Sequence, residues 1–419
     1  MRERTLRRMG TRRTRTAFYL LALVSGIFLS FSVFSDVLTY SMFLPHPIAF
    51  ALAEQWLSLL FTLTIILFLS IPTNRKRRRS IGTRLDRSFY QISLPSRKVV
   101  VSIILAGMFA GIATVAYYFV AGSGTDVSAV LPFAQFSIIY LMIGDLILIR
   151  DYPTNIEFQS ILAITFGVLL IGMIPGVIDL GLLLIVVSLW AGGRAMSVFF
   201  QSRAKRREIQ PGATTDSLNL RLWVLLILNC SMTLFMIPLI TPEVILLLVF
   251  QLPLVIHWVL IPVTFTFFTF VTYLQALGKG KMSAVQGINS ISVVLGLPLS
   301  IIGAVFFPTV FSPLSPDPFF WFLRIVGIIF VVSGIIALAL SEMRGYVLIK
   351  RAPDCPDLMA QLYRIRGVKK VSHITGKWDL LVRVDIRSLG SARAKILRKI
   401  EETRGVTDME TLLILKEWD

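Results

Sequence analysis

Long apolar runs, separated by short polar loops, follow one another through the first 340 residues of the chain. A helix needs about 20 mostly apolar residues to cross the hydrocarbon core of a bilayer. Because the runs meet or nearly meet that length, the pattern predicts a membrane protein built from helices. Ten spans are expected, over residues 17–38, 47–71, 99–120, 128–149, 158–175, 180–200, 222–240, 252–277, 282–307 and 319–340.

The apolar run 244–277 is too long for one span of about 20 residues and too short for two spans with a turn. Two spans here would move every later loop to the other side of the membrane. We expect a single span over 252–277, with 244–251 as a helical extension on the outer side, because this choice gives the charges a consistent distribution.

With ten spans, the basic segments all fall on one side of the membrane. They include RKRRR at 75–79, RAKRR at 203–207, and Lys279 and Lys281, whereas the loops on the other side contain no Lys or Arg. Cytoplasmic loops carry such an excess of positive charge. The pattern therefore predicts a multi-pass protein of the cell membrane with both termini in the cytoplasm.

Composition supports the same class of protein. The chain is 55% hydrophobic and only 16% charged, with a formal net charge of +18 from 42 Lys and Arg against 24 Asp and Glu. A single water-facing core could not bury so much apolar surface. Since the basic excess lies in the N-terminal segment 1–16 and the cytoplasmic loops, we expect it to attract anionic lipid headgroups and expect no nucleic-acid partner.

A short repeat divides the helical region 17–341 into halves of about 17–175 and 180–341. Ser-Ala-Val at 128–130, before the fourth expected span, recurs at 283–285 before the ninth, and small-residue patterns surround Gly167 in the fifth and Gly334 in the tenth. Five spans is an odd number, so the second half must enter the membrane in the opposite sense. This predicts two inverted five-helix repeats, with a substrate site near the midplane where they meet.

At these residues the helical region resembles the EamA-type drug/metabolite transporter superfamily. The best-matched stretch is SAVLPFAQFSIIYLMIGDLILIRDYPTNIEFQSILAITFGVLLIG, where Asp151 stands at the place of a common Glu and Ser160 replaces a usual Gly. The second half departs further, with the insertion PTVFSPLSPDP. The resemblance implies transport of a small metabolite.

After Ser341 the pattern changes to that of a water-facing domain. GYVLIKR reads as a strand, DCPDLMAQLYRIRG as an amphipathic helix, and HITGKWDLLVRVDI as a hairpin with Gly376 at its turn. A second helix, ending at Gly405, and the strand METLLILKEW follow. The order βαββαβ predicts an α+β domain of the ferredoxin-like kind.

Residues 345–419 resemble the effector-binding module of the Lrp/AsnC regulators, also called the RAM domain, through YVLIK, GVKKV, ITGKWDLLVRV and GVTDMETLLIL. The resemblance implies an amino-acid effector held where subunits meet, near Gly376, Lys377, Asp379 and Thr411, and at least a dimer. Met409 replaces the first hydroxyl of the family's TxT pattern, which weakens the case for a free amino acid. The family's DNA-binding segment has a transmembrane helix in its place here.

Polar residues at membrane depth are candidates for a transport pathway, because they are costly in lipid unless they face water or a partner. Glu54 is either a cation or proton site or a carboxylate at the outer mouth, and His257 either couples protons or joins helices. Gln135 and Asn289 either line a cavity or bond neighbouring helices. Each of these alternatives is open from the sequence.

Three further features have simpler structural readings. Arg194 and Arg324 lie near expected helix ends, where a long side chain can reach the interface. Gly107 and Gly111 form a GxxxG pattern that favours close helix packing, within the chain or between copies.

The chain has no Walker A motif, no metal-ligand cluster, no CxxC and only three His. We therefore expect no enzyme activity, cofactor or metal. The leading hypothesis is a transporter of a small metabolite, such as an amino acid or a related compound, with a cytoplasmic domain for amino-acid sensing and self-association. The alternative is a membrane-anchored receptor or scaffold that does not transport.

Overall fold

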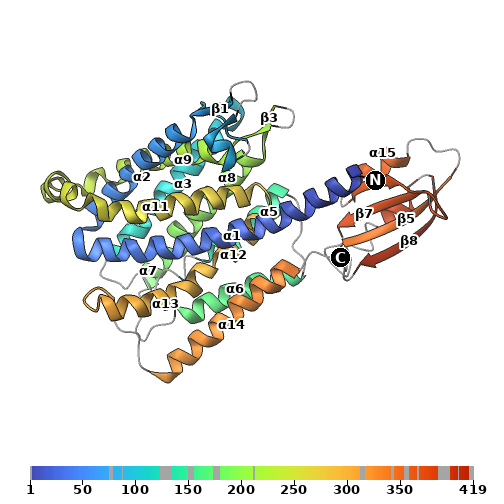
Figure 1. Ribbon diagram of the computed structural model, residues 1–419. Coiled ribbons are helices and arrows are strands. Elements are labelled where there is room, and N and C mark those ends of the chain that lie inside the picture. Colours follow the sequence, from blue (N-terminus) through green and yellow to red (C-terminus); the bar gives the residue numbers. More distant parts are fainter. Residues whose placement is uncertain are drawn as a thin grey trace. The chain divides into compact units, whose positions relative to one another are not determined.

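The structure is a computed structural model of the chain. It describes residues 2–74, 79–86, 88–122, 132, 135–149, 155–172, 180–210, 213–311, 317–340, 344–352, 358–365, 368–385, 397–403 and 405–414. Its contacts divide the chain into two units, Met1–Asp151 with Ile161–Ile335, and Tyr152–Ser160 with Ile336–Asp419. The first unit is mostly helical, and the second carries a four-stranded sheet (Figure 1).

The described helices before residue 341 follow the expected apolar runs. They are α1 (Arg2–Phe43), α2 (Pro47–Leu69), α3 (Arg97–Gly122), α5 (Ser137–Ile149), α6 (Asn155–Ile171), α7 (Leu180–Ile185), α8 (Gly192–Arg206), α9 (Ser217–Met236), α10 (Pro242–Leu246), α11 (Leu252–Leu277), α12 (Met282–Asn289), α13 (Ile291–Phe306) and α14 (Pro318–Leu340). Short turns η1 (Ile81–Arg84) and η3 (Ile237–Leu239) and the hairpins β1–β2 (Pro72–Asn74, Arg79–Ser80) and β3–β4 (Glu208–Gln210, Ala213–Thr214) complete this region.

Seven of the described helices are long and apolar enough to cross a bilayer. Two more expected spans coincide with shorter apolar helices, Ser137–Leu148 and Asn155–Ile171. The sixth coincides with α7 and α8, which are joined by the π-helical turn η2 (Val186–Ala191). These helices make the protein membrane-embedded in character, while the count of ten spans stays a prediction.

The long run 244–277 forms one helical rod. α10 continues into α11 through a second π-helical turn, η4 (Leu247–Gln251), and together they cover Pro242–Leu277. No turn reverses the chain within it, because each junction residue keeps right-handed helical backbone angles. The structure thus agrees with one span plus an extension.

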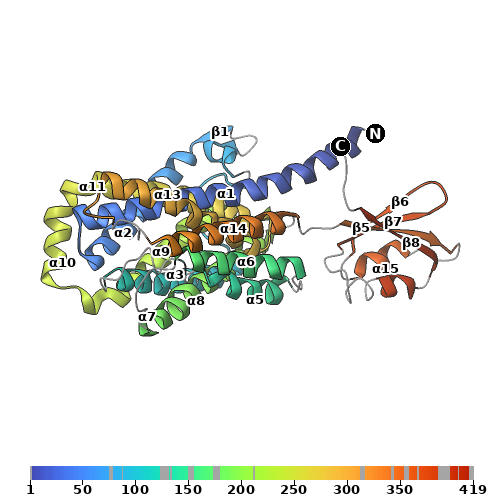
Figure 2. The ribbon, with the colours of Figure 1, turned by 90° about the horizontal axis from the view of Figure 1, so that it is seen from below.

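The most extensive helix pairs in the first unit recur when each helix is replaced by its counterpart in the other half. α1 packs on α11 as α8 packs on α3, α2 packs on α11 as α9 packs on α3, and α1 packs on α13 as α8 packs on α5. α2 also contacts α9, its own counterpart, and α5 contacts α12, the helix just before its counterpart α13. The pairs α1–α11 and α6–α14 lie side by side in Figures 1 and 2.

Small residues allow the closest of these helix crossings. A Cβ added at Gly167 on α6 would lie 2.5 Å from the carbonyl oxygen of Gly327 on α14, and one added at Gly327 would lie 2.6 Å from the carbonyl oxygen of Gly167. Gly107 and Gly111 meet α9 in the same manner, at Ile227 and Ser231. The GxxxG pattern therefore serves packing within the chain.

The second unit contains a four-stranded antiparallel sheet with the order β6-β7-β5-β8. Its strands are β5 (Arg344–Arg351), β6 (Val368–His373), β7 (Leu380–Asp385) and β8 (Val406–Ile414), with helix α15 (Leu358–Arg364) between β5 and β6. Residues 397–401 form a second helix. The observed strands and helices follow the expected order, and the ferredoxin-like assignment stays a prediction.

One face of this sheet is buried by the two helices. Leu380, Val382 and Val384 alternate along β7 and are fully buried against Leu358 and Leu362 of α15. The period-two alternation read from the sequence therefore identifies the covered face correctly.

A charged cluster at one end of the helical bundle joins the segment before α3 to the last turn of α8 and the start of α9. Asp86 accepts hydrogen bonds from the backbone N–H of Ser217 at 2.7 Å and from Lys205 Nζ at 3.5 Å. Lys205 also donates to Ser217 Oγ and to the carbonyl oxygen of Thr215, both at 2.8 Å. Burial alone would raise the pKa of Asp86, but Lys205 and the hydrogen bonds from Ser88 and Ser217 outweigh it and lower the pKa to about 2.

The Gly167–Gly327 crossing should tolerate no side chain. We expect Gly167→Ala to lower the stability of the helical unit by about 1–3 kcal/mol, because the new methyl meets backbone atoms that cannot move independently. Gly296→Ala on α13 is the control, since nothing lies within 4 Å of its added Cβ. Thermal unfolding of purified protein in detergent measures both. Equal unfolding midpoints for the two variants would contradict the crossing.

Ionised Asp86 should stabilise the fold. Since its folded pKa lies below its ordinary value of 3.8, the contribution is fully present above about pH 4 and is lost as the pH falls toward about 2. Asp86→Asn should cost about 2 kcal/mol at pH 7 and should approach the wild type in stability below pH 3. Unfolding midpoints across that range test this, with exposed Glu401→Gln as control. A constant difference at every pH would count against it.

Candidate functional site

A cavity of about 190 Å³ lies inside the first unit, between helices of both halves. Its walls come from α1, α2 and α3 of the first half of the helical region and from η2, α8, α9, α11 and α12 of the second half. Two interrupted helical segments adjoin it. Trp190 belongs to the π-helical turn η2, and Asn289 ends α12, which Ser290 separates from the start of α13. Such interruptions in membrane helices commonly mark binding sites.

Two carboxyl groups face this cavity. Asp36 lies on α1 and Glu54 on α2, and they are 8% and 3% exposed. The Tyr118 hydroxyl of α3 donates a hydrogen bond to Glu54 Oε2. Asp36 Oδ1 is buried and has no hydrogen-bond partner among the described residues. The two carboxyl groups interact electrostatically with each other.

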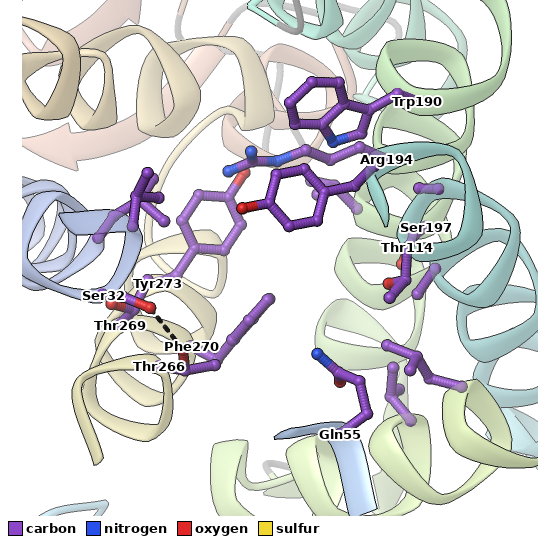
Figure 3. A pocket seen from close by; sticks show the side chains of 18 of the residues that line it. Ser32, Gln55, Thr114, Trp190, Arg194, Ser197, Thr266, Thr269, Phe270 and Tyr273 are labelled. Carbon is purple, nitrogen blue, oxygen red and sulfur yellow. Dashed lines mark hydrogen bonds between the residues drawn. The ribbon is translucent and has the colours of Figure 1, made fainter. Parts of the chain in front are cut away.

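Two arginines face the same cavity from the second half. The Arg221 guanidinium of α9 lies 3.9 Å above the Phe270 ring, and its Nε has no hydrogen-bond partner among the described residues. Figure 3 shows the Arg194 side chain of α8 extending beside Trp190, toward the hydroxyl of Tyr273. Arg221 and Glu54 also interact electrostatically. The cavity therefore presents both signs of charge within an aromatic wall.

A chain of hydrogen-bonded polar side chains, called the polar chain below, begins at the cavity residue Tyr273. The Tyr273 hydroxyl donates to Gln286 Oε1 at 2.8 Å, and Gln286 Nε2 donates to Gln135 Oε1 at 3.1 Å. Ser290 Oγ reaches the same Gln135 oxygen at 3.3 Å. Gln135 and Ser290 occupy matching places in the Ser-Ala-Val repeat, so this bond joins equivalent positions of the two halves.

Asp145 of α5 caps the N-terminus of α12, the helix that also carries Gln286 of the polar chain. Its carboxylate accepts the backbone N–H groups of Met282 and Ser283 at 3.0 and 2.8 Å, and the Ser283 hydroxyl at 2.7 Å. A carboxylate satisfies free N–H groups at a helix start and is favoured by the helix dipole. Asp151, singled out by the resemblance, lies outside the described residues.

The predicted pathway residues are placed in three different ways. Glu54 and Asn289 line the cavity, and the Asn289 amide atoms are buried without hydrogen-bond partners among the described residues. Gln135 lies in the adjoining polar chain. His257 is exposed on α11 with its ring 5.6 Å from that of Trp258, and it does not line the cavity.

The sequence pattern did not predict that three charged residues line the cavity, namely Asp36, Arg194 and Arg221. Arg194, expected near a helix end with its side chain reaching the interface, lines the cavity. Arg324, for which the same was expected, is buried on α14 near Trp321 and does not line the cavity. Asp36 and Arg221 received no assignment. The available signal was the same as for Glu54, namely a single charge within or at the edge of a long apolar run.

In the second unit, the turn expected to hold an effector is well defined. Gly376 has a φ of +137°, and Gly376 and Lys377 are exposed, with Lys377 Nζ 5.7 Å from the centre of the Trp378 ring. Asp379 Oδ2 accepts the backbone N–H of Arg351 at 2.8 Å. Thr411 lies on β8 opposite Val347, and its side chain is outside the described residues.

The described part of the chain contains no group of three or more His, Cys, Asp or Glu side chains that could hold a metal ion. Cys230 is a free thiol, and Cys355 lies outside the described residues. The charged cavity and the exposed turn of the sheet each present polar groups of the described residues to their surroundings.

Comparison with known proteins identifies the second of these regions. Residues 345–419 match the family described as the Lrp/AsnC ligand binding domain, over the same boundaries that the sequence resemblance predicted. The C-terminal part of the chain is therefore an Lrp/AsnC ligand-binding domain. No curated protein matches the chain in sequence.

A solved structure titled "Crystal structure of protein" has a TM-score of 0.51 and 13% identity, and the match covers 77% of this chain and 97% of that chain. The C-terminal domain alone could not supply that share, so the likeness includes the helical region and is one of fold. "Crystal structure of PH0061" matches with a TM-score of 0.16 and 17% identity, over 31% of this chain and 75% of that chain.

Proposed function

We propose that the helical region transports a zwitterionic small metabolite of the amino-acid class. The observation that carries this proposal is the cavity between the two exchangeable halves, which presents carboxyl groups from the first half and guanidinium groups from the second. A substrate with one ammonium and one carboxylate can pair with both signs of charge at once. The apolar and aromatic wall suits the remainder of such a molecule.

The exchange-symmetric helix pairing supports an alternating-access mechanism. Two halves that make the same contacts in either order can adopt two mirrored arrangements of similar energy, with the cavity open first to one side and then to the other. We propose ten spans in two inverted repeats, as in the EamA-type superfamily. The pairing of α5 with α12 supports this plan.

The orientation follows from the basic loops. We propose that both termini are cytoplasmic in the cell membrane, so that the ends of α2 and α8 near Asp86 and Lys205 face the cytoplasm. α12 begins on that same side, so the polar chain from Tyr273 to Gln135 would separate the cavity from the cytoplasm. The transport step involves no covalent chemistry, and an ion gradient would supply its energy.

The Lrp/AsnC ligand-binding domain would sense an amino acid in the cytoplasm and pair with a second copy. We propose that ligand binding at the Gly376 turn biases the arrangement of the transporter, through the short connection after α14. A ligand acts in this way only if it binds one arrangement better than the other. Couplings of about 1–3 kcal/mol are typical and would change activity roughly 5- to 150-fold.

The cavity arginines should govern uptake. In proteoliposomes preloaded with a mixture of unlabelled amino acids, wild-type protein should take up at least one labelled amino acid of a full panel. Arg194→Gln should reduce that uptake at least about tenfold, since a charge-assisted bond to the carboxylate is lost. Arg203→Gln, exposed on the same helix α8, is the matched control.

Two results would count against this function. Absence of uptake for every amino acid in the wild type would favour a receptor or scaffold that does not transport. Equal uptake by the Arg194 and Arg203 variants would exclude the cavity as the substrate site.

The C-terminal domain should bind an amino acid through the charge of Asp379. We expect Asp379→Asn in the full-length protein to weaken binding by about tenfold in calorimetric titrations with amino acids, because the amide oxygen can still accept the Arg351 N–H while the charge is lost. Exposed Asp408→Asn is the control. No binding by the wild type would leave a domain for self-association alone, and a monomeric mass by light scattering would refute self-association.

A further inference from the structure

We propose that Asp36 carries an exchangeable proton beside an ionised Glu54, which makes this carboxyl pair the proton-binding site of the transport cavity. The inference rests on the transport function proposed above and identifies the proton as the ion that is exchanged for the substrate. It assigns a separate role to each carboxyl group, and the assignment follows from what each one contacts.

Both carboxyl groups are enclosed in the same part of the bundle. Asp36 on α1 and Glu54 on α2 each lie seven residues from the neighbouring helix ends Phe43 and Pro47, which places them at about the same depth. Both are more than nine-tenths buried. Two negative charges held together in a medium of low dielectric repel each other strongly, so the pair favours the state with one proton bound.

The contacts decide which group keeps its charge. Glu54 accepts a hydrogen bond from Tyr118 and interacts electrostatically with Arg221, and both contacts favour its carboxylate form. Asp36 Oδ1 has no donor among the described residues, and the charge that acts on this carboxyl from the described part of the chain is the like charge of Glu54. The proton therefore resides on Asp36.

The remaining ionisable groups around the pair do not provide a second counter-charge. Arg194 faces Tyr273 across the cavity and interacts with it electrostatically. Tyr118 donates its hydroxyl to Glu54, and the tyrosines near the pair bring no positive charge. Among the described residues, the titratable groups that face the pair or share its helices at this depth are Tyr40 on α1, Tyr117 and Tyr118 on α3, Arg194 on α8, Arg221 on α9 and Tyr273 on α11.

The position of Asp36 on the cavity wall makes its proton exchangeable. When the ammonium group of a substrate approaches, its positive charge favours the Asp36 carboxylate. The O–H bond of the carboxyl group then breaks, the proton passes to water in the cavity, and the carboxylate pairs with the ammonium. One proton leaves for each substrate that binds, so the two cargoes compete for the same site.

Infrared spectroscopy of the full-length protein in lipid tests the assignment without any substrate. The wild type at neutral pH should show the C=O stretch of a protonated carboxyl group, which shifts in D₂O and disappears as the pH is raised. Asp36→Asn should abolish this band. Glu54→Gln should retain it, with its disappearance moved to lower pH, because the like charge that opposes the Asp36 carboxylate is gone.

Asp145→Asn is the control for a second buried carboxyl group, since Asp145 is bonded to the N-terminus of α12. It should leave the band in place. A band that survives Asp36→Asn and vanishes in Glu54→Gln would place the proton on Glu54 and overturn the assignment. A wild type without a titrating band would overturn the proton site altogether.

Uptake in proteoliposomes separates this inference from the transport function. Wild-type uptake of an amino acid from the panel should respond to an imposed pH gradient, and the response should be lost in Asp36→Asn. Uptake that ignores the gradient in the wild type would refute proton exchange while transport stands. Absence of any uptake would refute transport, and the infrared band would still decide the proton site.

Discussion

The cost of placing charge inside a bundle of apolar helices is the constraint on which the rest of this structure depends. Asp36, Glu54, Arg194 and Arg221 lie within or beside long apolar helices, where lipid cannot solvate them. They gather around one cavity, in which each sign of charge faces the other and water can enter. The same groups that would destabilise isolated helices thereby form the polar part of the cavity wall.

Close helix packing makes that gathering possible. Glycines bring α6 against α14 and α3 against α9 at distances that no side chain would allow, so helices from the two halves approach through backbone contacts. Because the pairing is the same when the halves are exchanged, the cavity lies at the boundary between two similar bodies. Polar bonds such as that between Gln135 and Ser290 cross this boundary at equivalent positions.

Much of the fold could be predicted from the sequence, because it depends on local periodicity. Apolar runs marked the helices, and alternation at Leu380, Val382 and Val384 marked the buried face of the sheet. The Lrp/AsnC ligand-binding domain was identified with its boundaries. Helix starts and junctions were less predictable, since the π-helical turns at Val186–Ala191 and Leu247–Gln251 have no separate signature in an apolar run.

The sequence by itself determined which charged residues need water or a partner, since a single carboxylate such as Glu54 in an apolar run is costly wherever the helix packs. Only the tertiary structure decided that Asp36, Arg194 and Arg221 share its cavity and that His257 does not. The reason is that the face of a helix directed toward its neighbours depends on contacts with residues distant in sequence, such as Gly107 against Ile227. Helical periodicity in a uniformly apolar segment leaves that rotation undetermined.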